Sequence, residues 1–296
     1  MSGKRTDEAK GRGDSAPAIA IFVFGRREYA YAAQHLALTL KEHSPEIPVH
    51  IWADEDLPVH PSYYTEVHRL DPIWYQDGPG ALKLHIHDIL PAGDWLYLDA
   101  DMLCLSDIGP AIESLKAHDF ALDVRGSGGE NDSIPYTPWA TNETVRRVAK
   151  LPADAVYYGV QTSWMWIRKG APAPMLVFGA ARDLHDKFKP SDLKEQWGGS
   201  IPDELCISAA LSKTGIEPHS APITFYGTHG AYGNKFNEAK RNHPLACLYG
   251  DTRMHRLVAT RWIDQYDRYV RAMYQRKGRL IGMDIHRIMK NKHVTK

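Results

Sequence analysis

The sequence predicts an α/β fold with a mixed, mostly parallel sheet flanked by helices. Residues 18–24 form a continuous apolar run of β-favouring side chains, which is the pattern of a buried strand. Residues 29–43 carry apolar side chains at the spacing of an amphipathic helix, and another strand begins at Val49. Strand, helix and strand at this spacing make a βαβ unit, which implies parallel strands joined by a right-handed crossover.

The rest of the chain continues this alternation. A helix at residues 82–90 leads through a turn with Pro91 and Gly93 into an apolar strand at residues 95–98. Further strands are predicted at residues 120–124 and 160–167, and further helices at residues 203–211 and 254–273. Residues 125–136, rich in Gly, Ser, Asn and Asp, are predicted as an exposed loop suited to act as a lid, and residues 223–237, rich in Gly and aromatic side chains, as another loop.

Length and composition are those of a soluble globular protein with one large domain. The 296 residues can bury a sizeable core, and 43% hydrophobic with 24% charged residues is ordinary for this class. The formal net charge is zero, so the chain as a whole gives no sign of a polyanionic partner. We predict a disordered lead-in at residues 1–17, a main domain at residues 18–250 and a basic helical extension at residues 251–296.

Cysteine usage indicates a reducing compartment. Cys104, Cys206 and Cys247 lie far apart, without the close pairs that would indicate a zinc site or a disulfide framework. Residues 1–17 lack the apolar core of a signal peptide, and no apolar run approaches the roughly 18 residues of a membrane-spanning helix. We therefore expect a cytoplasmic protein without a transmembrane segment.

Two acids, Asp99 and Asp101, directly follow the predicted strand at residues 95–98. Their carboxylates are close together, and like charges in a poorly solvated site repel each other. A hard divalent cation such as Mn²⁺ or Mg²⁺ relieves this repulsion, and such a cation commonly carries phosphate oxygens on its other side. The pattern predicts a metal–diphosphate site at the edge of the sheet, although a strand-end turn or a helix cap would also explain the two acids.

A haloacid-dehalogenase-type phosphatase is one enzyme class with an Asp-x-Asp after an apolar strand. In that class the first Asp is the nucleophile and the strand usually opens the fold, whereas here a complete βαβ unit precedes the motif. Asp101 is followed by Met-Leu-Cys instead of a small Thr or Val, and no later Gly-Asp-x-x-x-Asp set occurs. These departures disfavour the phosphatase.

The order of the motifs instead resembles the GT-A (Rossmann-like) nucleotide-sugar glycosyltransferases, in particular the glycogenin-like, family 8 retaining enzymes. Lys83, the Pro-containing turn at residues 90–94 and the sequence Tyr-Leu-Asp-Ala-Asp at residues 97–101 look like the core of that family. The resemblance implies that Asp99 contacts the metal and the nucleotide ribose, that Asp101 binds the metal, and that Lys83 faces the donor.

Two looser matches follow in the family's order. Residues 160–165 resemble a family segment, Asn-Ser-Gly-Val-Met, that lies beside the donor sugar, with Gln161 in place of Asn and Ser163 in place of Gly. Asp203 and Glu204 resemble the family's Asp-Gln pair, which binds sugar. The resemblance therefore makes Gln161 and Asp203 the candidate catalytic residues.

A last match lies near the predicted loop at residues 223–237. The family has a metal-binding His, and six residues later a Lys that holds the diphosphate, and His229 and Lys235 keep that interval. Gly233 is one place late, and Phe236 and Asn237 stand where the family has Pro-Trp. The resemblance implies a third metal ligand in His229 and a phosphate contact in Lys235.

Three more residues are candidates for contact with the donor. Phe24 and Tyr29, near the first strand, are placed to stack on the nucleotide base, and core packing is the competing explanation for Phe24. Asp123, at a strand end ahead of the predicted lid, is a candidate for contact with the sugar. Trp139, Trp164 and Trp166 are candidates for lining a sugar site, with core packing as the alternative for the last two.

Structural explanations also compete with the other assignments. His229 can form a hydrogen bond within an aromatic-rich loop, and Lys83 can be a solvated helix residue. Asp203 and Glu204 open a helix after Pro202, where acidic side chains favour the helix dipole without any chemistry.

The sequence thus predicts a metal-dependent glycosyltransferase that uses a nucleoside diphosphate sugar, a UDP-sugar by resemblance, with retention of configuration implied by the family alone. Mn²⁺ is favoured over Mg²⁺ because His229 would add an imidazole ligand. The alternative is a non-catalytic protein of the same fold that binds a nucleotide-sugar or nucleic acid.

The acceptor is not indicated by the sequence. Residues 251–296 contain twelve Lys or Arg against four Asp or Glu. Three explanations fit such a segment: the solvent-exposed face of a helix, an amphipathic element that binds anionic lipid, or a surface that binds the backbone of a nucleic acid. A glycan, a lipid-linked glycan and modified DNA therefore all stay open as acceptors, with DNA or an anionic membrane as possible partners.

Overall fold

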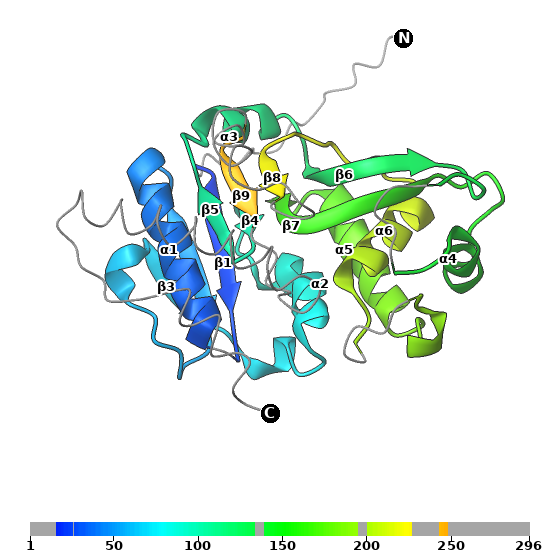
Figure 1. Ribbon diagram of the computed structural model, residues 1–296, viewed down its shortest axis with the longest axis horizontal. Helices are drawn as coiled ribbons and strands as arrows, with labels where there is room; N and C mark the ends of the chain where they lie inside the picture. The colour runs from blue at the N-terminus through cyan, green and yellow to red at the C-terminus, as the bar shows by residue number, and fades with distance from the viewer. Residues whose placement is uncertain (1–15, 26, 134–138, 195–199, 227–242, 248–296) are drawn as a thin grey trace, which may run out of the picture.

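The structure is a computed structural model that describes residues 16–25, 27–133, 139–194, 200–226 and 243–247 (Figure 1). The strands are β1 (Ala18–Val23), β2 (Val49–Ala53), β3 (Glu66–Arg69), β4 (Gly93–Leu98), β5 (Met102–Cys104), β6 (Phe120–Gly128), β7 (Tyr157–Lys169), β8 (Thr224–Tyr226) and β9 (Leu245–Cys247). The α-helices are α1 (Arg27–His43), α2 (Pro79–Ile89), α3 (Gly109–Leu115), α4 (Asn142–Ala149), α5 (Pro172–His185) and α6 (Asp203–Thr214), and the short 3₁₀ turns are η1 (Pro61–Tyr63), η2 (Pro72–Trp74) and η3 (Pro190–Asp192).

The predicted mixed, mostly parallel sheet is confirmed. Six strands form it in the order β3-β2-β1-β4-β7-β6. Strands β3, β2, β1 and β4 run parallel, whereas β7 is antiparallel to both β4 and β6. Because the four parallel strands end at the same edge, the segments that follow them meet there, which is where open α/β sheets bind ligands.

Side chains alternate across the sheet and fill a core on each face. On β1, Ile19 and Ile21 pack into a core that α1 and α3 complete. Ala20 and Phe22 point to the other face, where α2, α5 and α6 supply the partners. The helices therefore flank the sheet on both sides, as predicted.

A smaller sheet lies beside the main one, with β9 between β5 and β8 (Figure 1). β9 is antiparallel to β5 and parallel to β8. Met102 pairs with Cys247, and Cys104 pairs with Leu245. The pairing of β5 with β9 therefore fixes the position of the segment that directly follows Asp101.

The structure corrects both predicted loops. Strand β6 continues to Gly128, which pairs with Tyr157 of β7, so the first part of the predicted lid at residues 125–136 is a paired strand. Thr224–Tyr226 forms β8 inside the predicted loop at residues 223–237. In both places hydrogen bonds to a partner strand override the local turn-forming composition.

Residues 1–15 and 248–296 lie outside the described ranges, so the lead-in and the basic helical extension stay predictions. No helix in the part of the chain that the structure describes has the length and apolar character needed to cross a membrane.

Candidate active site

Asp99 and Asp101 lie in a tight turn at the carboxyl end of β4. The backbone N–H of Asp99 donates to the carbonyl oxygen of Ser163 on β7 (2.8 Å), which continues the ladder between β4 and β7. The N–H of Met102 donates to the carbonyl oxygen of Asp99 (3.3 Å), so the chain reverses into β5. The turn holds both carboxylates at the carboxyl edge of the sheet.

Lys83 connects α2 to this turn. Its Nζ lies 2.9 Å from Oδ1 and 3.0 Å from Oδ2 of Asp99, and 3.7 Å from Oδ2 of Asp203. The hydroxyl of Tyr97 donates to Asp99, and the hydroxyl of Thr162 donates to Asp203. Three residues that the sequence suggested separately, Lys83, Asp99 and Asp203, therefore form one network from α2, the β4–β5 turn and α6.

A glycine in α2 allows the close packing that brings Lys83 to this position. A Cβ atom on Gly80 would lie 2.7 Å from the carbonyl oxygen of Ile201, just before α6. Real Cβ atoms do not approach a backbone oxygen so closely, so a larger residue would push α2 away from the start of α6.

Lys83 balances the charge of the network. Burial disfavours the charged amine, but the Asp203 and Asp99 carboxylates outweigh this effect and hold the pKa of Lys83 well above its usual value. Burial raises the pKa of Asp99, and the Lys83 ammonium chiefly opposes that rise. Lys83 is therefore a fixed cation at neutral pH, placed between two carboxyl groups.

Glu204 follows Asp203 in the first turn of α6, and its environment favours the protonated form of its carboxyl group. Its Oε2 accepts a hydrogen bond from Nε1 of Trp139 (2.8 Å). Burial raises the pKa of Glu204 to about 7, and the neighbouring Asp203 adds to the rise. Glu204 and Trp139 line a small crevice together with Tyr157 and Ser208. Close to pH 7, Glu204 can thus either donate or accept a hydrogen bond in this crevice.

The oxygen donors near the turn suit a hard cation, with one condition. Asp101 is half-buried, whereas both carboxylate oxygens of Asp99 contact Lys83. A cation bound by Asp99 would have to share this carboxylate with Lys83 and with the Tyr97 hydroxyl. Within the described ranges, no third His, Cys, Asp or Glu completes a ligand group with Asp99 and Asp101, and the predicted ligand His229 lies outside those ranges.

The thiol of Cys247 lies near the same turn and is not suited as a ligand. Burial raises the pKa of Cys247 well above its usual value, and Asp101 and Asp99 add to the rise. Carboxylate oxygens, not a thiol, are the donors that a hard cation prefers.

Asp123 and Gln161 lie opposite each other on β6 and β7, next to an irregularity in the pairing. Asp123 is buried, and its Oδ2 forms an ion pair with Arg125 (2.6 Å). Gln161 is half-buried and precedes Thr162, which contacts Asp203. These two predicted site residues thus lie together on the strands that border the Lys83 network.

An open pocket lies at the carboxyl ends of β1, β2 and β3, and none of the predicted site residues that the structure describes lines it directly. The pocket is open to solvent, and its lining includes Gly25, Asp54, Arg69 and Tyr75. The ring of Phe24, directly after β1, stacks on Tyr75 with 4.6 Å between ring centroids. Phe24 therefore supports the pocket through Tyr75.

The remaining predicted residues lie in three different kinds of place. Tyr29 is exposed on α1. Trp164 and Trp166 are fully buried in the core, which corrects their assignment to a sugar site because core packing accounts for both. His229 and Lys235 lie outside the described ranges.

Two contributors to the network were not predicted as site residues. Tyr97 and Asp99 have the spacing of residues on the same face of a strand, so the alternation of β4 contained a signal for the Tyr97 hydrogen bond. Thr162 contacts residues far away in the sequence, and no local pattern indicates those contacts.

Solved structures with a similar backbone are glycosyltransferases. The galactosyltransferase LgtC, solved in complex with donor and acceptor sugar analogues, is 12% identical, with a TM-score of 0.54 over 87% of this chain and 96% of LgtC. WbbM, a bifunctional glycosyltransferase solved in its apo form, is 13% identical, with a TM-score of 0.52 over 90% of this chain. The chain spans about half of WbbM, 52% of its length.

The chain has the GT-A fold. The GT-A assignment rests on the structure, since no protein-family model and no curated protein matches the sequence. Membership of family 8, which is narrower than the GT-A fold, stays a prediction.

Proposed function

We propose that this GT-A chain is a metal-dependent glycosyltransferase that takes a sugar from a nucleoside diphosphate sugar. The observation that carries the proposal is the network of Lys83, Asp99 and Asp203 beside Asp101 at the carboxyl edge of the sheet. This edge is where open α/β sheets bind ligands. LgtC, which shares the fold, was solved with donor and acceptor sugar analogues, the class of ligand proposed here.

Asp99 and Asp101 are the proposed metal ligands, together with His229. Mn²⁺ is the proposed ion, because an imidazole ligand suits it better than Mg²⁺. When bound, a divalent cation would neutralise the negative charge that develops on the departing diphosphate. Lys235 is proposed to add a fixed positive charge at the phosphates.

The open pocket at the ends of β1, β2 and β3 is the proposed place of the nucleotide base. Its wall contains Tyr75, whose ring is supported by Phe24, and aromatic faces of this kind stack on bases. Tyr29, exposed on α1, is proposed to complete the contact. Uridine is the base implied by the family 8 resemblance.

Asp203 and Gln161 are proposed to face the donor sugar, with Asp123 beside them on β6. An inverting enzyme needs a base that takes a proton from the acceptor. Gln161 has no basic group, and Asp203 is engaged by Lys83 and Thr162. Because Glu204, beside Asp203, has its pKa raised to about 7 and so has the ionisation that a base requires, retention of configuration is proposed from the family resemblance alone.

Hydrolysis of the donor tests the proposal. The full chain is incubated with Mn²⁺ and a panel of sugar nucleotides, and the release of the nucleoside diphosphate is measured. Asp101→Asn is expected to lower the Mn²⁺-stimulated rate by at least about 100-fold, the range for loss of one strong electrostatic stabiliser. Asp154→Asn, at an exposed acid between α4 and β7, is the matched control and is expected to keep the wild-type rate.

The alternatives give different results in the same assay. Tight binding of a sugar nucleotide without metal-stimulated turnover would favour a non-catalytic binding protein. Release of inorganic phosphate from a simple monoester would indicate a phosphatase.

The acceptor is addressed by mass spectrometry of candidate glycans, lipid-linked glycans and modified DNA after incubation with an accepted donor. The proposed contact of residues 251–296 with DNA or with an anionic membrane is tested separately. Salt-sensitive binding to DNA is compared with binding to anionic vesicles.

A further inference from the structure

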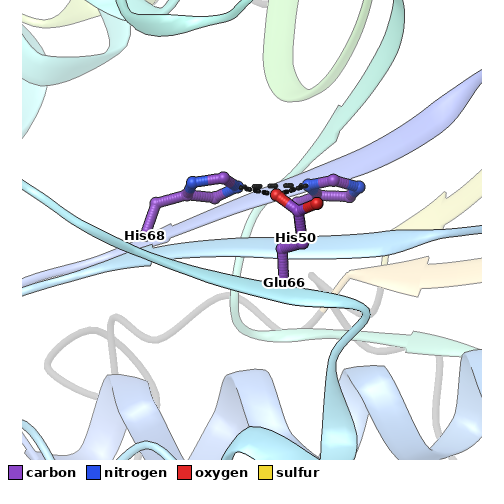
Figure 2. Close-up of side chains that lie close together, drawn as sticks. All are labelled: His50, Glu66 and His68. Carbon is purple, nitrogen blue, oxygen red and sulfur yellow. Dashed lines mark hydrogen bonds and ion pairs between the residues drawn. The ribbon is translucent and has the colours of Figure 1, made fainter.

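Three side chains with metal-binding atoms lie together on the outer strands of the main sheet, separated from the Asp99 turn by β1. They are His50 on β2, and Glu66 and His68 on β3 (Figure 2). His50 pairs with Glu66 in the parallel register. Because side chains alternate along a strand, Glu66 and His68 point to the same face and flank His50. Nothing in the proposed glycosyl transfer uses this group.

The distances between the three ligand atoms match those of a tetrahedral zinc site. Nδ1 of His50 lies 3.1 Å from Nε2 of His68, and Oε2 of Glu66 lies 3.3 Å from His68 Nε2 and 3.7 Å from His50 Nδ1. Ligands about 2.05 Å from a tetrahedral Zn²⁺ ion are separated by about 3.4 Å. The three atoms therefore already have the separation that one shared ion requires.

At present Nδ1 of His50 and Nε2 of His68 point at each other, as a hydrogen bond between the two imidazoles requires. Their planes differ by 9°, and Figure 2 shows the two nitrogens pointing at each other, with the Glu66 carboxylate beside the gap. To bind one ion, each ring would have to turn about its Cβ–Cγ bond so that both nitrogens point to that ion.

Neighbouring aromatic rings pack against the two histidines. Trp52 stacks on His68 with 4.4 Å between ring centroids, and Trp95 contacts His50 edge to face at 5.1 Å. Burial lowers the pKa of His50, and Glu66 partly opposes this effect.

We propose that His50, Glu66 and His68 bind one divalent transition-metal ion, with Zn²⁺ as the best match to two imidazoles and one carboxylate. The side chain of Glu66 is 58% exposed, which leaves room for water as a fourth ligand. The set differs from the Asp99 turn, whose oxygen donors suit a harder cation.

The bound ion would join the edge strand β3 to β2. β3 has only four residues and, among the residues that the structure describes, pairs with β2 alone, so its attachment depends on few backbone hydrogen bonds. Asp54, directly after β2, and Arg69, the last residue of β3, both line the open pocket. An ion at this position would therefore brace one wall of that pocket.

Zinc titration of the full chain tests the proposal without an activity assay. The background variant Asp101→Asn removes a carboxylate of the other proposed metal site, and its Zn²⁺ uptake is measured by calorimetry. One Zn²⁺ per chain is expected, together with a higher melting temperature when Zn²⁺ is added. Adding His68→Gln, or separately Glu66→Gln, is expected to weaken this binding by at least about 10-fold.

Controls separate this site from general binding by surface histidines. His185→Gln, on α5, is the matched control in the same background and is expected to leave Zn²⁺ uptake unchanged. Circular dichroism checks that each variant is folded, and Glu66→Gln disturbs the packing least because this side chain is the most exposed of the three. The proposal is wrong if Asp101→Asn takes up no Zn²⁺, if both ligand variants bind Zn²⁺ as tightly as their parent, or if His185→Gln weakens binding equally.

Discussion

Replacing Glu204 by Gln is expected to stabilise the protein at pH 8 and to leave its stability nearly unchanged at pH 5. Gln has almost the same shape, and its amide oxygen can still accept the hydrogen bond from Trp139. Gln cannot ionise, so the substitution removes the buried negative charge and little else. The comparison of the two pH values therefore isolates the effect of that charge.

The magnitude follows from the pKa of Glu204, which burial, with Asp203, raises from 4.5 to about 7. The folded chain thus holds this proton more tightly than the unfolded chain. The resulting stabilisation is fully present below about pH 4.5 and is lost as the pH rises through about 7. A difference of about 2.5 pKa units corresponds to about 3 kcal/mol, the largest gain expected for Glu204→Gln at pH 8.

Urea unfolding at pH 5 and pH 8, followed by tryptophan fluorescence, measures this effect for wild type and variant. Glu143→Gln, at an exposed glutamate in the first turn of α4, is the matched control and is expected to change stability equally at both pH values. If Glu204→Gln also shifts the free energy of unfolding by the same amount at both pH values, the assignment of a raised pKa to Glu204 is refuted.

Three further substitutions are expected to destabilise the protein in urea unfolding at pH 8. Lys83→Met leaves two buried carboxyl groups without their cation, at a cost of about 3–5 kcal/mol. Trp139→Phe removes the hydrogen bond to Glu204. Its loss is expected to lower the free energy of unfolding by about 1.5–3 kcal/mol at pH 8, where Glu204 is charged, and by less at pH 5, where Glu204 is protonated. Gly80→Ala brings a Cβ against the carbonyl oxygen of Ile201, and the strain of about 1–3 kcal/mol exceeds the gain of about 1 kcal/mol in helix propensity.

Each of these substitutions has a comparison that could contradict it. Lys116→Met removes a more exposed lysine that is paired on the protein surface, and a loss as large as that of Lys83→Met would argue against a special role for the buried cation. Equal losses for Trp139→Phe at pH 5 and pH 8 would mean that the charge of Glu204 is irrelevant. A more stable Gly80→Ala protein would show that α2 has room next to α6.

The parts of the fold that were predicted depend on short-range patterns. The apolar run of β1, the periodic stripe of α1 and the run of β4 before Asp99 each encode their own structure, and the order of these elements indicates a parallel sheet. Lys83 and Asp203 were identified because they occupy positions in a recognisable order of motifs. Their mutual contact, however, depends on three elements that only the fold brings together.

The parts that were not predicted depend on partners distant in the sequence. β3 is short, polar and exposed, so nothing in Glu66–Arg69 itself indicates a strand. β6 was predicted to end early because its second half is rich in Gly and Ser, yet the long β7 pairs with it along its length. The group of His50, Glu66 and His68 follows from the register between β2 and β3, which no local pattern contains.

The pairing of β5 with β9 has a consequence for biosynthesis. The turn with Asp101 is clamped by a strand that is translated long after β1, β2 and β4, because Met102 pairs with Cys247. Closing so long a loop is entropically costly, and domains on the ribosome assemble from their early segments first. A nascent chain is therefore expected to assemble its parallel strands while the carboxylate turn is still unfastened, so that competence to bind a cation arises only after β9 has been synthesised.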